Sequence, residues 1–314
     1  MTLPKVLMTD VIRSTQQGDS HGGAYLIDLE SGSFEQVLDW NRIEIDWEGR
    51  GMGRGLRGIC FVGDEVYIAA SDELFVFDRD MKMLRSHRCD FLHHCHEISY
   101  DGERFIYLTS TSFDSVLRFD VGVGVFDRAL WFGGSPNGMV VRGYDPMGSD
   151  GPPKVDMMHL NQVIVVDGVV YLSALRLGAM WTVDFESAAA AMHAKVPSMT
   201  HNCQPFGDGM VLMNSTGEDR VVIADRRGKV MKRFDYPTYE ESAMSHVGIG
   251  EDHARQGFGR GLCVDRGWGE RGLVIAGSSP GTVSGFDVAS GEMVASVNVS
   301  MDIRNAPHGL EIWA

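Results

Sequence analysis

Apolar residues in this chain alternate with polar ones over short stretches, and the alternation recurs in one arrangement. An apolar stretch ends at an aspartate, a short polar turn follows, and a second alternating stretch begins. A period of two residues on either side of a turn predicts a β-hairpin. Six copies of the pattern are found, with their aspartates at Asp28, Asp78, Asp120, Asp184, Asp225 and Asp287.

A further pair of alternating stretches precedes five of the six hairpins, as in GICFVGDEVYIAAS (58–71) and QVIVVDGVVYLSAL (162–175). Four strands per unit, repeated at intervals of roughly forty to sixty residues, are typical of β-propeller blades. A helical period of 3.6 residues is favoured at most over Ser187–Ala194. The expected fold class is therefore all-β.

The first unit lacks its leading strand, because the chain starts at Lys5-Val-Leu-Met and goes directly to the hairpin at Asp28. The C-terminal stretch HGLEIWA (308–314) has the pattern of a missing inner strand and matches RGICF at Arg57 and RGLCV at Arg260. An open ring would leave unpaired strand edges, so the two ends are expected to share one blade. The prediction is a six-bladed β-propeller, a single domain over residues 1–314, closed by its C-terminal strand.

The blade pattern resembles the six-bladed propellers of the NHL-repeat and gluconolactonase-like groups over nearly the whole chain. The segments RGLRGICF (54–61), HHCHEI (93–98) and HLNQV (159–163) also resemble a group of uncharacterised bacterial propeller proteins. The resemblance implies the fold and no particular reaction, because propellers serve many unrelated functions.

Composition agrees with a turn-rich globular protein, since 38 of the 314 residues are glycine and 44% are hydrophobic. A formal charge of −15 argues against nucleic acid and membrane as partners, because both favour a basic surface. The five cysteines do not indicate a disulfide framework. Neither a secretory signal nor an apolar run of membrane length is recognisable, so a cytoplasmic location is expected.

Histidines gather where the first strand of each predicted blade begins. The six starting positions hold Leu56-Arg57-Gly58, His94-Cys95-His96-Glu97, His159-Leu160-Asn161-Gln162, His201-Asn202-Cys203-Gln204, Gly259-Arg260-Gly261 and Pro307-His308-Gly309. Four of the six carry histidine and the other two carry arginine. Because the first strands line the channel of a propeller, we expect the imidazoles to converge on its axis.

Convergent imidazoles indicate a transition-metal site, because neutral imidazole binds iron, zinc, copper and nickel. Fe²⁺ is the favoured cofactor and Zn²⁺ is possible. Glu97, Gln162 and Gln204 follow the histidines and are expected to orient them. His93 is expected to point away from the face that His94 and His96 share. The predicted ligands are His96, His159, His201 and His308, with His94 as an alternative to His96.

Arg57, Arg260 and Glu97 are the predicted catalytic residues beside the metal. The two arginines would bind a carboxylate or phosphate group, which makes an anionic small molecule the expected substrate. The alternative is structural: the arginines pair with carboxylates and the histidines line a hydrated channel. A nucleophilic thiol at Cys95 or Cys203 is a weaker candidate, because no accompanying catalytic signature is present.

Three long insertions are expected to join the last strand of one blade to the first strand of the next. They cover 41–54, 133–158 and 236–257, and carry Trp47, Arg50, Asn137, Arg142, Tyr144, Asp145, Tyr239, Glu240, His246 and His253. Long ordered loops on the face where the histidines begin are typical of binding elements or lids. Variable surface loops without a role are the alternative.

Two kinds of propeller enzyme are similar in having axial histidines. Carotenoid-cleaving oxygenases use four histidines for iron on seven blades, and a peptide-amidating lyase uses three for zinc on six blades. The similarity implies a metal-dependent oxidoreductase or lyase acting on a small molecule. The alternative is a non-catalytic propeller that presents its loops to a protein or small ligand. A lactonase is disfavoured, because the acidic calcium-ligand set expected of it is not evident.

Overall fold

The computed structural model describes residues 1–13, 20–40, 55–135, 138–248 and 255–313, in which nearly all regular structure is β-strand. Helix is limited in these ranges to two 3₁₀ turns, η2 (Thr111–Phe113) and η3 (Glu241–Ala243). Within the same ranges no helix is long and apolar enough to cross a membrane. The helical alternative for 187–194 is wrong, because sheet pairing overrides the helix preference of its alanines.

The strands fall into two compact units, and the larger part of the second unit is Gly58–Leu212, joined by Ala224–Lys229. Three complete antiparallel sheets lie in it, with the orders β4-β5-β6-β7, β12-β11-β10-β9-β8 and β13-β14-β15-β16. Their strands are β4 (Ile59–Val62), β5 (Glu65–Ala69), β6 (Leu74–Phe77), β7 (Met83–His87), β8 (Ile98–Tyr100), β9 (Phe105–Ser110), β10 (Ser115–Asp120), β11 (Val125–Ser135), β12 (Gly138–Tyr144), β13 (Leu160–Val166), β14 (Val169–Ala174), β15 (Ala179–Asp184) and β16 (Ala189–Lys195).

The first unit consists of Met1–Arg57, Met213–Ile223 and Val230–Ala314. It contains the sheets β25-β1-β2-β3 and β21-β22-β23-β24, and the residues of a sixth sheet, β17-β18-β19-β20, are divided between the two units. The strands of these sheets are β1 (Lys5–Ile12), β2 (Gly23–Asp28), β3 (Ser33–Asp39), β17 (Thr200–Phe206), β18 (Met210–Ser215), β19 (Arg220–Asp225), β20 (Val230–Asp235), β21 (Gly259–Asp265), β22 (Leu273–Ser278), β23 (Thr282–Asp287), β24 (Met293–Asn298) and β25 (Asn305–Ile312).

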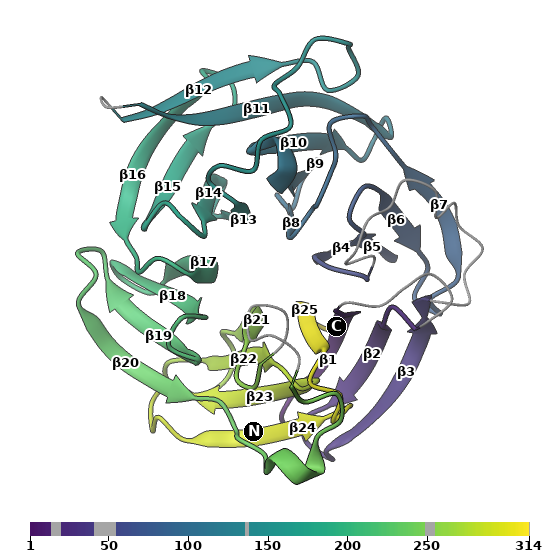
Figure 1. Cartoon of the computed structure of the whole chain (residues 1–314), viewed down its shortest axis with the longest axis vertical. Helices are drawn as coiled ribbons and strands as arrows, with labels where there is room; N and C mark the ends of the chain where they lie inside the picture. Colours follow the sequence, from purple (N-terminus) through teal and green to yellow (C-terminus); the bar gives the residue numbers. More distant parts are fainter. Residues whose placement is uncertain (14–19, 41–54, 136–137, 249–254, 314) are drawn as a thin grey trace. The chain divides into compact units, whose positions relative to one another are not determined.

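Six antiparallel sheets of this kind confirm the predicted six-bladed β-propeller. The C-terminal strand closes the N-terminal blade as expected, because β25 pairs antiparallel with β1 in the register Val6↔Ile312 and Met8↔Leu310. Figure 1 shows β25 beside β1 at the edge of this sheet. That all 314 residues behave as one domain stays a prediction.

The repeated aspartates owe their recurrence to a local requirement of the turns. Five of them end the third strand of their blade, Asp78 directly follows that strand, and all six accept backbone N–H groups from the turn that follows. Asp28 accepts from Glu30 and Ser31, both at 3.0 Å, and the other five aspartates make the same kind of bond. A carboxylate in this position replaces a backbone acceptor and fixes the turn.

The apolar core lies between neighbouring sheets. In the second unit, Tyr67 of β5 belongs to the same buried cluster as Leu108 of β9 and Leu117 of β10. In the first unit, Met8 of β1 is clustered with Ile275 of β22. The outermost strands are more exposed, as in β7, where four of the five residues are exposed. Each inner strand is therefore held in place by apolar contacts as well as by its sheet.

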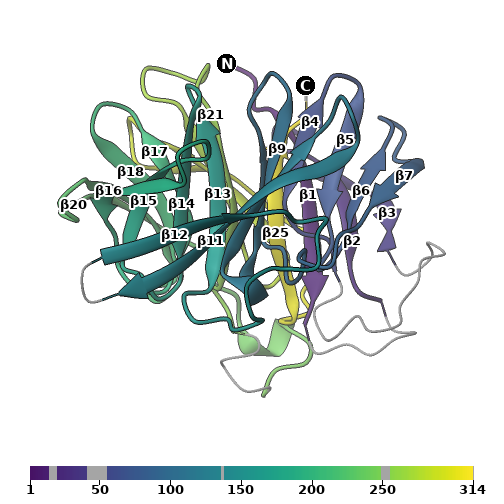
Figure 2. The same ribbon diagram turned by 90° about the horizontal axis from the view of Figure 1, so that it is seen from above.

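The insertion over 133–158 is only partly a loop, which corrects the prediction made for it. β11 continues to Ser135, and β12 then pairs with it in a register from Ala129↔Tyr144 to Ser135↔Gly138. The hairpin gives this blade a fifth strand, seen alongside β11 in Figure 2. The apolar run at 139–141 favours this strand, and 145–159 connects the blade to β13. The insertion over 41–54, with Trp47 and Arg50, lies outside the described residues, as do Asn137 and His253.

A buried carboxyl group joins the three inner strands of the closing blade. Asp10 Oδ1 accepts the Gly23 N–H at 2.6 Å, and Asp10 Oδ2 accepts from Asn305 Nδ2 at 2.6 Å. Gly22 lies against it with φ +97°, and a Cβ there would meet Asp10 Oδ1 at 2.1 Å, so only glycine fits. Burial raises the pKa of Asp10 to about 7.

Replacing this acid by its amide, Asp10→Asn, should flatten the dependence of the unfolding free energy on pH. The unfolded chain loses the proton near the ordinary pKa of 3.8, whereas the folded protein keeps it until about pH 7. The wild type therefore loses stability as pH rises through this window, by roughly 4 kcal/mol at most. The new amide would still accept from Gly23 and would donate to the Asn305 side-chain oxygen.

Urea unfolding at a series of pH values between about 4 and 8 measures this effect. Asp287→Asn is the control, because that aspartate accepts a turn N–H at the surface. A variant at position 10 that kept the wild-type slope would contradict the assignment.

Candidate functional site

Four of the five histidines predicted as ligands lie together in the second unit. His94 and His96 precede β8, His159 immediately precedes β13, and His201 is the second residue of β17. The ring centre of His96 lies 4.8 Å from that of His94, 5.1 Å from His159 and 6.4 Å from His201. The centres of His94 and His159 are 5.7 Å apart. We call these four residues the histidine group.

The backbone of the histidine group is unusual, because two of its members have left-handed conformations. His94 and His159 both have φ +59°, and Asn202, next to His201, has φ +51°. Such conformations cost about 1–3 kcal/mol for a residue other than glycine, and they persist only where the surroundings enforce them. The surroundings here are hydrogen bonds from one segment.

That segment covers residues 109–114, the end of β9 and the turn that leads from it to β10. Thr109 Oγ1 accepts the N–H groups of His96 and Glu97 at 2.9 and 3.0 Å. Ser110 Oγ accepts the N–H of His93 at 3.0 Å. The carboxylate of Asp114 accepts three more, from Met157 at 2.7 Å, Met158 at 3.0 Å and His159 at 3.1 Å. One segment thus accepts hydrogen bonds from two histidine-bearing stretches, one that precedes it in the chain (93–97) and one that follows it (157–159).

His93 does not belong to the group, as expected. Its Nδ1 lies 2.9 Å from Ser112 Oγ, and its Nε2 lies 2.9 Å from Lys154 Nζ. Burial and the Lys154 ammonium lower the pKa of His93. Both ring nitrogens therefore have protein partners.

Glu97 and its neighbours form an amide–carboxylate network beside the histidines. Asn202 Nδ2 donates to Glu97 Oε1 at 2.7 Å and lies 3.3 Å from Gln162 Oε1. Gln162, Asn202 and Gln204 are buried. The network links the Glu97 carboxylate to Asn202, while its predicted role in orienting the imidazoles stays a prediction.

The other predicted site residues lie in the first unit and are buried there. Arg57, Arg260 and His308 expose 4%, 6% and 5% of their surfaces. The Arg57 carbonyl accepts from Thr9 Oγ1 at 2.5 Å, and the Arg260 guanidinium lies 4.8 Å from the centre of the Phe258 ring. That these three residues share one site with the histidine group stays a prediction.

The thiols are not arranged for nucleophilic chemistry. Cys95 and Cys203 are fully buried, and burial raises the pKa of the Cys203 thiol well above its usual value. The suggestion that a nearby cation lowers it is wrong for Cys203, because desolvation disfavours the thiolate. Cys60 and Cys263 are small buried strand residues, as predicted.

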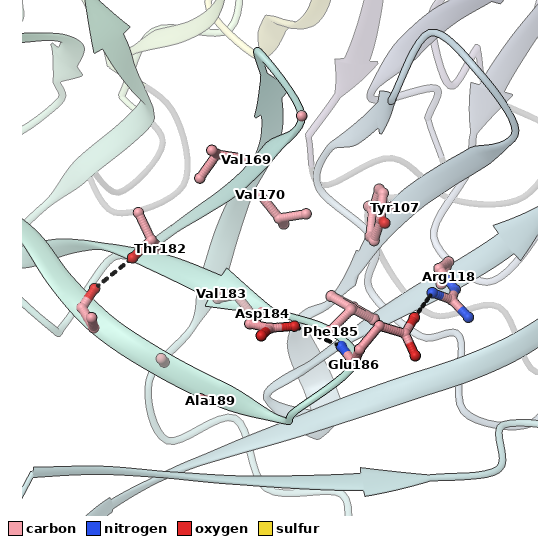
Figure 3. A pocket seen from close by; sticks show the side chains of 13 residues that line it. Tyr107, Arg118, Val169, Val170, Thr182, Val183, Asp184, Phe185, Glu186 and Ala189 are labelled. Carbon is pink, nitrogen blue, oxygen red and sulfur yellow. Dashed lines mark hydrogen bonds and ion pairs between the residues drawn. The ribbon is translucent and has the colours of Figure 1, made fainter.

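A surface hollow of about 500 Å³ lies elsewhere in the second unit, at the turn between β13 and β14. Figure 3 shows Tyr107, Val170 and Phe185 on its wall with the Arg118–Glu186 ion pair beside them. Arg118 also donates to both oxygens of Asp127 at 3.0 and 2.8 Å. The charge of Arg118 is therefore balanced. The hollow lies at the Val166 end of β13, whereas His159 precedes the opposite end of that strand.

As the side chains lie, no group of three or more His, Cys, Asp or Glu residues in the described part of the chain is arranged to hold a metal ion. Sequence reasoning gave no role to Asp114 and Asp156, which bond to His159, or to Asn202, which bonds to Glu97. Asp156 Oδ2 lies 2.8 Å from His159 Nδ1. Only the D-x-x-H spacing of Asp156 and His159 could have indicated one of these contacts from the sequence.

Comparison with known proteins defines the fold class. No family model and no curated protein matches the sequence. The structure is similar to that of a nidogen/laminin complex, with a TM-score of 0.56 and 11% identity over 98% of this chain and 97% of that one. A streptogramin B lyase gives 0.50 and 8% identity over 97% and 91%. Inactive virginiamycin B lyase from Staphylococcus aureus with quinupristin gives 0.47 and 9% over 82% and 73%. At these identities the likeness shows a shared propeller fold alone.

Removing the carboxylate of Asp114 should disturb the histidine group, whereas a matched removal should not. Asp114→Ala leaves three N–H groups without their acceptor, so we expect a loss of about 2–3 kcal/mol in unfolding free energy. Asp101 is the matched control, because it also accepts three N–H groups, from Glu103, Arg104 and Phe105 at 2.8–3.0 Å.

NMR spectra of the imidazole protons distinguish the two variants. The His159 resonances should shift in Asp114→Ala and stay in place in Asp101→Ala. Equal shifts in both variants, or none in either, would show that Asp114 does not position the histidines.

Proposed function

We propose that the protein is a metal-dependent enzyme in which the histidine group binds one divalent transition-metal ion. The observation that carries the proposal is the spacing of the four rings. An ion–nitrogen bond of about 2.1 Å places an imidazole centre about 3.2 Å from the ion, so two rings on one ion have centres at most about 6.4 Å apart. Four of the six pairs of rings in the group have centres 4.8 to 6.4 Å apart, which satisfies this limit.

Ring rotation reconciles this spacing with the side-chain orientations seen. The centre of an imidazole lies almost on the Cβ–Cγ axis, so rotation about that bond redirects both nitrogens and leaves the ring centre in place. This torsion is broad in histidine. The distances between ring centres are therefore unchanged by this rotation, whereas the directions of the ring nitrogens change.

The donor set favours a particular class of metal. Four neutral imidazoles suit Fe²⁺ and Zn²⁺ and disfavour Ca²⁺ and Mg²⁺, which prefer oxygen ligands. We propose Fe²⁺ first and Zn²⁺ second. A bound iron ion would supply dioxygen chemistry, and either ion would polarise a substrate oxygen.

Glu97 is the proposed acid–base residue of the site. It directly follows His96, its carboxylate is half buried, and Asn202 Nδ2 holds Oε1 at 2.7 Å. We expect its carboxylate to exchange a proton with a small substrate bound at the metal. The substrate that we propose is a small molecule.

A second candidate function is supported by the fold comparison. The nidogen/laminin structure has a higher TM-score than the lyases, and it is a complex between proteins. A non-catalytic propeller that presents its loops to a protein is therefore the alternative, and it requires no metal.

Metal analysis of the untagged protein after anaerobic loading with Fe²⁺ or Zn²⁺ tests the proposal. We expect about one ion per chain in the wild type and less than about a tenth of that in His96→Ala and His159→Ala. His193→Ala is the control, because His193 lies on the outer strand β16 with its ring 5.0 Å from Tyr171. Glu97→Gln should keep its metal.

Two results would contradict the proposal. One is a wild-type protein that takes up no ion under either loading condition. The other is equal loss of metal in the His193 and His159 variants, which would indicate adventitious binding at scattered histidines. The first result would favour the protein-binding alternative.

A further inference from the structure

We infer that Asp156 is the positioning residue of the histidine group: it fixes the proton of His159 on Nδ1 and so presents Nε2 as the coordinating nitrogen. The inference deepens the proposed metal site and rests on it for its functional meaning. It starts from the 2.8 Å separation of Asp156 Oδ2 and His159 Nδ1.

The chemistry of the pair determines the tautomer. An ionised carboxylate has acceptor oxygens and no proton to donate, so the imidazole nitrogen facing it must carry the hydrogen. A neutral imidazole has one N–H, and Nε2 is then left with its lone pair. A carboxylate behind a ligating histidine also raises the basicity of the coordinating nitrogen.

Asp156 is itself held in place by Arg176. The Arg176 Nη1 lies 3.3 Å from Asp156 Oδ1, and it donates to the carbonyl oxygens of Asp156 at 2.6 Å and Met157 at 3.1 Å. One guanidinium nitrogen thus contacts both the carboxylate and the backbone that carries it. Arg176 follows β14, so the aspartate is anchored to the sheet and does not depend on the loop alone.

His159 is constrained from two sides. Asp114 accepts its backbone N–H at 3.1 Å, and Asp156 accepts from its ring. Its side chain is 13% exposed, which limits competition from water. The ring meets those of His96 and His94 nearly edge-on, at interplanar angles of 67° and 81°.

The contrast with His93 shows what the carboxylate adds. His93 has a hydroxyl at Nδ1 and an ammonium at Nε2, so neither nitrogen is left for a ligand. His159 has an acceptor at Nδ1, which leaves Nε2 with a lone pair on the side away from the carboxylate. An exposed ion pair contributes little to the free energy of unfolding. We therefore assign the Asp156–His159 contact a role in orienting the ring.

Asp156→Ala is the test, with Asp145→Ala as the matched control. Asp145 lies in the same connection between β12 and β13, and its carboxylate accepts the Met147 N–H at 2.9 Å without contacting a histidine. Long-range ¹H–¹⁵N NMR of metal-free protein at about pH 8 reports the tautomer directly. We expect His159 to be predominantly Nδ1–H in the wild type and in the control, and to lose this preference in Asp156→Ala.

Zn²⁺ titration of the same three proteins supplies the second measurement. Affinity should fall by about 10–100-fold in Asp156→Ala and stay unchanged in Asp145→Ala. The inference is overturned if the tautomer of His159 is unchanged in Asp156→Ala, or if zinc affinity is unchanged while the wild type binds zinc. Failure of the proposed function is a separate result: the wild type then takes up neither Fe²⁺ nor Zn²⁺, and the tautomer alone decides whether Asp156 positions the ring.

Discussion

The arrangement of the candidate site depends on one set of hydrogen bonds, those that Thr109, Ser110 and Asp114 accept from the backbone of neighbouring segments. Left-handed backbone at His94 and His159 is unfavourable unless something compensates for it. Three N–H groups that end on a single carboxylate provide that compensation for His159, because a charged acceptor makes the stronger kind of hydrogen bond. Without these bonds the histidine-bearing chain would relax to extended backbone and the rings would separate.

A related contact recurs in both units and ties one blade to the next. Thr111, just after the second strand of its blade, donates to the carbonyl of Leu160 at the start of β13. In the first unit Thr216 donates to Gly259 at 3.0 Å, and Thr9 donates to Arg57 at 2.5 Å. Each hydroxyl satisfies a buried carbonyl that sheet pairing leaves over. Apolar residues pack between the sheets, and these hydroxyl groups bond to the backbone at or just before the start of the inner strands.

How far the sequence predicts this protein depends on the range of the interactions concerned. The six turn aspartates are visible because their partners lie two to four residues away, and the blade count follows from them. The histidine group follows from the repeat, since equivalent positions in successive blades must lie near one another.

The sequence left open whether His94 or His96 is the ligand, because the alternation rule assumes a strand. The chain is left-handed at His94 and β8 begins only at Ile98, so both rings reach the group. Asp114 was missed because its partners are more than forty residues away. β12 was missed because the short apolar run at 139–141 was assigned to a loop.

The pairing of β25 with β1 has a consequence for how the protein is made. Asp10 and Asn305, whose side chains bond across this joint, are 295 residues apart in the chain. During translation β1 is therefore synthesised long before β25. The edge of β1 that β25 covers stays unpaired for nearly the whole of synthesis. An unpaired strand edge invites pairing with other chains. The first blade is thus the last to be finished, and the nascent protein spends its synthesis time in the form most open to misassociation.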